Sequence, residues 1–181
     1  MNKKWKMTAL MGLAAIGMTT SAVSAEESYK IGICQLTQHA ALEQATRGFQ
    51  DYVSEKLGDN VTFDVQNASG ELSNCVTVIN AFVSEDVDLI LANSTPVLQA
   101  AASATDSIPV LGTSVTDYPA ALDLEKWNGV TGTNVSGTSD CAPLQQQAEM
   151  IMELFPEAKT VGILYCSAEP NSRYQTDIIK S

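Results

Sequence analysis

Short apolar runs separated by polar turns follow one another along the chain, and each run predicts a strand. Runs that lack polar alternation are typical of strands buried on both faces of a parallel sheet. Turn residues such as glycine, asparagine and proline bound the runs and keep the strands short. The pattern predicts strands at Tyr29–Gln35, Val61–Val65, Leu89–Ala92, Ile108–Leu111, Gly129–Thr133 and Thr160–Tyr165.

Between the strands, apolar residues spaced three and four positions apart predict helices. The first such face extends from Ala41 to Leu57, and Gly58 should end that helix. Thr95 followed by Pro96 suits the N-cap and the first residue of another helix. Further helices are expected around Cys75–Val83, at Pro119–Leu124, from a cap at Ser139 or Asp140 to Phe155, and from Asn171 or Ser172 onward.

The alternation of strands and helices predicts an α/β fold with a doubly wound parallel sheet. Residues 26–134 hold enough units for a complete first lobe, and the stretch 134–139 (NVSGTS) has the composition of a link between lobes. Residues 135–181 predict only one strand between two helices, and such a unit cannot bury both faces of its strand. We therefore expect this part to be the start of a second, incomplete lobe.

The first 25 residues predict a signal peptide. Three lysines precede an apolar core at 9–18, and small residues lead to a cleavage site after Ala25. A membrane anchor is the alternative, but it needs roughly 20 apolar residues and this core is shorter. Cleavage would leave the mature protein without stable membrane insertion, in the periplasm or an equivalent extracytoplasmic space.

The charge balance is strongly acidic. The chain has 10 basic and 21 acidic residues, and without the three lysines of the leader 7 basic residues remain, a net charge of −14. Such a surface disfavours binding to nucleic acid. It also disfavours adhesion to anionic lipid and is typical of a freely diffusing protein.

Four cysteines would permit three disulfide pairings in an exported protein. They have neither a CxxC motif nor metal-ligand spacing, and the single histidine, His39, cannot complete a zinc site with them. Buried free thiols are the preferred interpretation. The sequence also lacks a nucleophile–base pattern and a phosphate loop, so it predicts no catalytic residue, cofactor or metal.

Several longer stretches carry a family resemblance: GICQLTQHAALEQATRGF, NASGELSNC, LILANSTPVLQAAA, IPVLGTSVTDY, GTNVSGTSD and VGILYCSAEPNSRYQ. From Tyr29 onward the chain resembles the ABC transporter substrate-binding proteins of the tryptophan/tyrosine type, which have the type I periplasmic-binding-protein fold. The resemblance implies a first lobe with sheet order 2-1-3-4-5 and a small-molecule ligand held between two lobes. It also implies an ABC transporter permease as partner and a longer chain that completes the second lobe.

The implied strand order puts the switch point between the first and third strands, where open α/β sheets bind ligands. Hydroxyl groups and helix N-termini at this edge would suit a carboxylate, and acidic side chains would suit an ammonium group. The residues expected to bind the ligand are Gln38, His39, Ser94, Thr95, Thr113, Ser114, Thr116, Asp117, Tyr118, Glu169 and Asn171.

Some of these residues have a structural alternative. Thr95 would either bind a carboxylate or cap its helix, and both roles are compatible. Gln38 and His39 would bind the ligand or merely start the first helix.

For the ammonium group, Asp117 and Glu169 are preferred over Asp140, whose capping role is the stronger interpretation. Tyr118 would stack on an aromatic ligand at little entropic cost. Two other aromatic residues are expected to pack against the protein: Trp127 and Tyr165.

The leading hypothesis is an extracytoplasmic solute receptor of an ABC importer that binds a small polar or aromatic metabolite in a cleft between the lobes, preferably an amino acid, with aromatic amino acids among the candidates. The alternative is a ligand-sensing extracytoplasmic domain of a signalling protein. A secreted hydrolase has no supporting residue pattern. A repressor with this fold is disfavoured because the leader stands where a DNA-binding helix-turn-helix would be needed.

Overall fold

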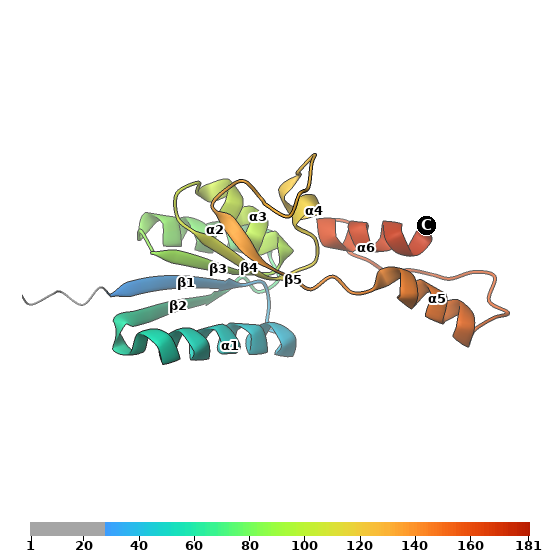
Figure 1. Ribbon diagram of the computed structural model, residues 1–181, viewed down its shortest axis with the longest axis horizontal. Coiled ribbons are helices and arrows are strands. Elements are labelled where there is room, and N and C mark those ends of the chain that lie inside the picture. Colours follow the sequence, from blue (N-terminus) through green and yellow to red (C-terminus); the bar gives the residue numbers. More distant parts are fainter. Residues whose placement is uncertain (1–27) are drawn as a thin grey trace, which may run out of the picture.

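The computed structural model describes residues 28–181, and the predicted signal peptide lies outside them. The described chain forms a five-stranded parallel sheet with the order β2-β1-β3-β4-β5 (Figure 1). This confirms the doubly wound α/β prediction and the strand order. The strands are β1 (Tyr29–Gln35), β2 (Val61–Asn67), β3 (Leu89–Asn93), β4 (Val110–Val115) and β5 (Val135–Ser139). The helices are α1 (Ala40–Leu57), α2 (Leu72–Ser84), α3 (Thr95–Ala104), α4 (Tyr118–Leu122), α5 (Leu144–Leu154) and α6 (Pro170–Lys180), with a 3-10 turn η1 (Gly58–Asn60).

The two faces of the sheet are covered unequally (Figure 1). On one face, α2 and α3 bury the larger core cluster, in which Ile90 of β3 packs with Phe82 and Leu98. On the other face, α1 packs over a smaller cluster that contains Ile33 and Leu91. Because successive strand residues point to opposite faces, one strand such as β3 supplies both clusters.

β5 differs from the prediction in place and in kind. Residues 129–133, predicted as a strand, form none, whereas the predicted link 134–139 contains β5, which pairs in parallel with β4. Only Val135 of this strand is buried. Because backbone hydrogen bonds to β4 hold this strand in place, it needs few apolar side chains. The sequence therefore has no apolar run here that would predict a strand. β5 carries the first sheet past residue 134.

Residues 160–165 form no strand, in contrast to the prediction. Val161, Leu164 and Tyr165 are 49%, 102% and 44% exposed. A strand requires a neighbour to complete its backbone hydrogen bonds, and the described residues place no strand beside this segment. The core position expected for Tyr165 is therefore wrong. Trp127, which was expected to pack against the protein, is 48% exposed and so is covered by the protein over about half of its surface.

α5 and α6 lie beyond the edge at which the strands end, and α6 packs against both α4 and α5 (Figure 1). The N-cap residue of α5 is Pro143, and no side chain caps this helix, so the caps predicted at Ser139 and Asp140 are wrong. α6 begins at Pro170, just before the predicted start. None of the helices within residues 28–181 combines the length and apolar character needed to cross a bilayer.

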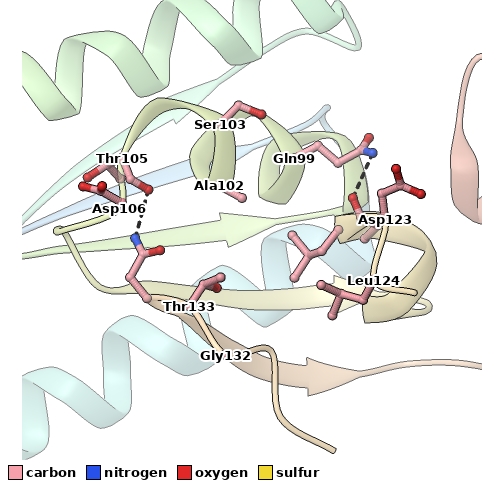
Figure 2. A pocket seen from close by; sticks show the side chains of 12 residues that line it. Gln99, Ala102, Ser103, Thr105, Asp106, Asp123, Leu124, Gly132 and Thr133 are labelled. Atoms are coloured by element: carbon pink, nitrogen blue, oxygen red, sulfur yellow. Dashed lines mark hydrogen bonds between the residues drawn. The ribbon is translucent and has the colours of Figure 1, made fainter. Parts of the chain in front are cut away.

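A cavity of about 600 Å³ lies between α3, α4 and the segment that leads into β5 (Figure 2). Thr105 and Asp106 precede β4, and Asn134 precedes β5, so the cavity reaches the edge at which these strands begin. Asn134 Nδ2 donates to Thr105 O at 3.1 Å and closes one side. None of the ligand-binding residues expected from the sequence lines this cavity.

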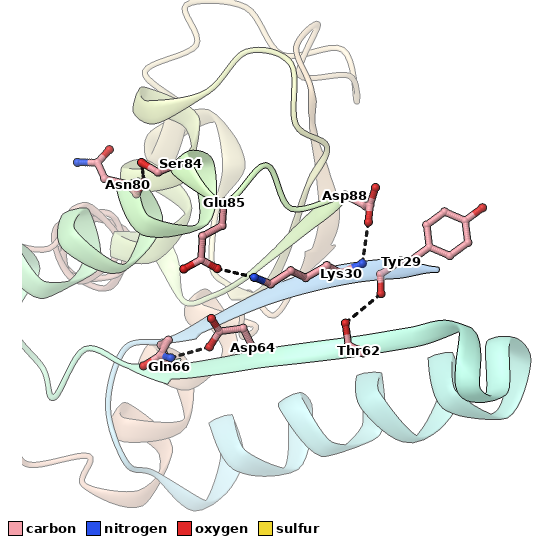
Figure 3. A network of polar contacts seen from close by, with 9 residues as sticks. All are labelled: Tyr29, Lys30, Thr62, Asp64, Gln66, Asn80, Ser84, Glu85 and Asp88. Atoms are coloured by element: carbon pink, nitrogen blue, oxygen red, sulfur yellow. Dashed lines mark hydrogen bonds and ion pairs between the residues drawn. The ribbon is translucent and has the colours of Figure 1, made fainter. Parts of the chain in front are cut away.

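A surface polar network fixes the start of β1 (Figure 3). Lys30 Nζ pairs with Glu85 Oε2 at 2.5 Å, and the backbone N–H of Lys30 donates to Asp88 Oδ2 at 2.6 Å. The hydrogen bond with Glu85 raises the pKa of the Lys30 ammonium group. Exposed ion pairs stabilise little, so the network serves mainly to align β1 with the connection between α2 and β3.

The four cysteines form two classes, and all are free. Cys34 at the end of β1 and Cys75 in the first turn of α2 are buried, which confirms the predicted buried thiols for this pair. Cys141 and Cys166 are exposed, so the prediction is wrong for them. The hydrogen bond with Cys75, together with burial, raises the pKa of the Cys34 thiol.

Thiol labelling should separate these two classes. A disulfide reagent should react promptly with Cys141 and Cys166 in the native protein, because the thiolate is the reactive form and needs exposure. Cys34 and Cys75 should react only after unfolding. Mass spectrometry before and after addition of denaturant would count the labelled thiols, and prompt labelling of all four would contradict the burial of the pair.

Candidate functional site

The carboxyl ends of the three central strands meet at one edge. Gln35, the last residue of β1, pairs with Asn93, the last residue of β3, which in turn pairs with Thr113 of β4. The N–H of Leu36 donates to Asn93 O at 3.3 Å and ties the first two loops together. The loops that carry most of the expected ligand-binding residues therefore leave the sheet side by side.

Ser94 and Thr95 open α3 without capping it. The N-cap is Ser94 rather than Thr95, and no side chain makes a capping hydrogen bond, so the capping alternative for Thr95 is wrong. Both hydroxyl groups are buried and have no hydrogen-bond partner. A buried polar group without a partner costs about 1–3 kcal/mol. Together with the free N–H groups of the helix end, these hydroxyls suit an acidic ligand group.

The backbone of Ser94 is strained. Its φ of 136° and ψ of 163° lie in a region that is essentially restricted to glycine. Such a conformation costs of order 1–3 kcal/mol and is concentrated at ligand-binding and catalytic sites. The strain therefore makes the turn between β3 and α3 a candidate ligand-binding position.

A buried hydrogen-bonded network lies beneath this edge, and the sequence analysis missed it. Asn93 Nδ2 donates to Leu42 O at 2.8 Å and to Thr46 Oγ1 at 3.0 Å. Thr46 Oγ1 donates to Gln35 Oε1 at 3.0 Å, and Gln35 Nε2 donates to Thr37 O at 2.7 Å. Polar residues at the ends of apolar strands were the available signal, because such residues are buried only when they have partners.

At the start of α1, the structural alternative holds for His39. His39 is the N-cap, and its Nδ1 accepts a hydrogen bond from the N–H of Ala41 at 3.2 Å. Gln38 directly precedes it, and both side chains are exposed. The structure thus places these residues at the expected edge, with His39 already engaged by its own helix.

The three hydroxyl residues after Gly112 have different surroundings. Thr113 lines a cavity of about 340 Å³ with Phe49. Ser114 has a left-handed backbone, with φ 55°, at an irregular register between β4 and β5. Thr116 is buried, and its Oγ1 lies 3.4 Å from Gln175 Nε2 of α6, so α6 reaches the loop after β4.

Asp117 caps α4, because its Oδ2 accepts a hydrogen bond from the N–H of Ala120 at 2.8 Å. Tyr174 of α6 responds to this carboxylate, because burial, followed by the charge of Asp117, raises the pKa of the Tyr174 hydroxyl. Asp117 is therefore already engaged by its own helix. This weakens its candidacy as the partner of a ligand ammonium group.

Tyr118 lies in the core instead of at the binding edge. It is 7% exposed, and its Oη donates to Gly112 O at 3.1 Å. Burial, and secondarily the charge of Asp140, raises the pKa of its hydroxyl to about 12. The burial of its side chain argues against the predicted stacking of Tyr118 on a ligand.

Glu169 and Asn171 lie together at the start of α6. Glu169 Oε2 accepts hydrogen bonds from Asn171 Nδ2 at 3.5 Å and from Ser172 Oγ at 3.3 Å. Asn171 Oδ1 is buried and has no partner. Within residues 28–181, no three His, Cys, Asp or Glu side chains cluster as a metal ion would require.

Comparison with known proteins identifies the family of this chain. The family described as ABC transporter substrate binding protein matches residues 30–181. The chain belongs to this family. The tyrosine-binding protein of Clostridioides difficile (strain R20291) is 41% identical over 150 residues, which is 81% of this chain and 43% of the relative.

Two solved structures of similar proteins extend the comparison. The ABC domain in complex with L-Trp from Streptococcus pneumonia is 38% identical with a TM-score of 0.78, and a ligand-free, open substrate binding protein with adhesive properties from Clostridium difficile is 39% identical with a TM-score of 0.64. Each match covers 84% of this chain and 52% of the other protein. The chain thus spans about half the length of the relatives that it matches.

Proposed function

We propose that this protein is the extracytoplasmic solute-binding component of an ABC importer and that it binds an amino acid, with tyrosine or tryptophan as the leading candidates. The observation that carries the proposal is the pair of buried, unpartnered hydroxyls of Ser94 and Thr95 at the N-terminus of α3. They lie where doubly wound sheets bind ligands. The names of the tyrosine-binding and tryptophan-bound relatives support an aromatic ligand.

In this proposal the two hydroxyls that donate hydrogen bonds to the ligand carboxylate, those of Ser94 and Thr95, belong to the first lobe. Residues 26–134 together with β5 form most of this lobe. Residues from about 140 onward begin the second lobe, which supplies Glu169 as the remaining acidic candidate for the ligand ammonium group. Residues 1–25 would direct export, and an ABC permease would accept the loaded protein. The acidic charge of −11 for the whole chain supports a soluble receptor.

Calorimetric titration of the full-length protein with L-tyrosine and L-tryptophan tests the proposal. We expect one of the two to bind and to raise the melting temperature by mass action. Absence of binding by both ligands, and by every other α-amino acid, would refute the proposed function.

Thr95→Val should weaken ligand binding about tenfold, because the ligand would lose one hydrogen bond in a buried site. It should not lower the free energy of unfolding, because the Thr95 hydroxyl has no partner in the protein. Thr77→Val is a matched control on an exposed helix position, where the hydroxyl bonds Ser73 O of its own helix. Equal affinities of the Thr95 variant and the wild type would show that this hydroxyl does not touch the ligand.

A further inference from the structure

Asn93 is buried, and its side-chain amide is satisfied on one side only. The residue is 0% exposed, and its Nδ2 donates two hydrogen bonds to α1. Its Oδ1 is buried as well but has no partner. Buried side-chain amides in folded proteins nearly always use both ends, so the lone carbonyl oxygen requires an explanation.

The hydrogen-bonded network determines which way this amide faces. Leu42 O can only accept a hydrogen bond, so the nitrogen of Asn93 must face it. The Thr46 hydroxyl gives its single proton to Gln35 Oε1 and must therefore accept from Asn93. Gln35 is oriented in turn, because its Nε2 donates to Thr37 O. Each hydrogen bond in this series is donated in the same direction, from β3 towards the loop after β1. If the Asn93 amide were flipped, its Oδ1 would face the carbonyl oxygen of Leu42.

Asn93 also lies next to the proposed carboxylate site. It directly precedes Ser94 and Thr95, and it is paired with Gln35 of β1, so it lies at the switch point between β1 and β3. Three consecutive residues thus carry buried, unpartnered oxygen atoms at one edge of the sheet. Two of these oxygens are hydroxyls, which can donate, and the third is a carbonyl oxygen, which can only accept.

We propose that Asn93 binds the ligand through Oδ1, which accepts a hydrogen bond from the protonated amine of an α-amino acid whose carboxylate is held by Ser94 and Thr95. Thr46 and Gln35 are positioning residues that hold the amide in this orientation. The inference rests on the proposed function and extends it by assigning a selective role to a buried amide. In an α-amino acid the amine is attached next to the carboxylate, so neighbouring donor and acceptor groups in the protein match it.

A neutral acceptor is suited to this position. Burying a carboxylate costs far more than burying an amide unless the charge is paired. The acidic candidate on the same lobe, Asp117, already accepts a hydrogen bond from the N–H of Ala120. The Asn93 amide offers an acceptor that is rigid before the ligand arrives, which reduces the ordering cost of binding.

A crystal structure of the full-length protein with L-tyrosine tests the contact directly. We expect the ligand nitrogen within about 3.2 Å of Asn93 Oδ1. An Oδ1 atom bonded instead to a water molecule, or to another protein group, would overturn the proposal.

The positioning role is tested by a pair of substitutions at Thr46. Thr46→Val removes the hydroxyl and frees the Asn93 amide, so the Kd for L-tyrosine should rise about tenfold. Thr46→Ser keeps the hydroxyl and should change the Kd by less than about twofold. Thr46→Ala, which favours the helix, replaces the valine variant if that variant does not fold.

A ligand that lacks the amine separates positioning from general damage. 3-(4-Hydroxyphenyl)propanoate keeps the ring and the carboxylate of tyrosine. Its Kd should be the same for Thr46→Val as for the wild type. Equal losses for this compound and for L-tyrosine would overturn the inference alone. Failure of the wild type to bind any α-amino acid would overturn the inference and the proposed function together.

Discussion

Replacing Gly137 with alanine should lower the free energy of unfolding by about 3 kcal/mol, as expected for a side chain forced into a closely packed site. Gly137 of β5 lies opposite Gly112 of β4, and the hydroxyl of Tyr118 fits into the space that both glycines leave. A Cβ atom at Gly137 would overlap Gly112 O and Tyr118 Oη. The φ of 150° at Gly137 is also one that other residues rarely adopt.

Denaturant unfolding of the two proteins measures this effect. Gly48→Ala is the matched control, because Gly48 lies within α1 and a Cβ there would meet nothing within 4 Å. That substitution should stabilise the protein by about 0.5–1 kcal/mol, since glycine is unfavourable inside a helix. If Gly137→Ala also proved neutral or stabilising, the close approach of β4, β5 and Tyr118 would be refuted.

Ser94→Gly should stabilise the ligand-free protein by about 2 kcal/mol and at the same time weaken ligand binding. The gain comes from relief of the strained φ and ψ of Ser94, which glycine adopts without steric cost. It is reduced by the larger conformational freedom of glycine in the unfolded chain. The loss of affinity comes from the missing hydroxyl, which has no partner within the protein and is therefore free for the ligand.

Ser94→Ala separates the two effects. Alanine lacks the hydroxyl but retains the strain, so affinity should fall as it does in the glycine variant without the gain in stability. Thermal or denaturant unfolding without ligand, and calorimetry with L-tyrosine, would measure both quantities. A glycine variant no more stable than the alanine variant would show that the backbone of Ser94 is not strained.

Ser94→Gly is expected to raise the stability of the free protein and to lower its affinity for the ligand, because both quantities depend on the same turn. The backbone between β3 and α3 is held in an unfavourable conformation by its surroundings, because Asn93 is anchored to α1 and Thr95 begins a buried helix. The same conformation brings the three unpartnered oxygens of Asn93, Ser94 and Thr95 to one edge. The unpartnered oxygens lower the stability of the free protein, and a ligand that supplies their hydrogen-bond partners recovers this free energy on binding.

The sequence by itself determined the elements that local patterns encode. Apolar runs located β1 and β3, helical spacing with Gly58 located α1, and the Thr95-Pro96 pair located the start of α3 to within one residue. These signals are local because strand and helix periodicity depend on neighbouring residues alone. The family resemblance supplied the sheet order, which local patterns do not contain.

Only the tertiary structure decided which polar groups are paired and which remain free. Asp117 and His39 are used by their own helices, whereas Ser94 and Thr95 are not, and the sequence pattern of all four is that of a helix start. The network around Asn93 joins residues up to 51 positions apart, so no local pattern reveals it. β5 likewise depends on its partner β4, because an edge strand with one buried residue is held by backbone hydrogen bonds to a distant segment and not by its own apolar content.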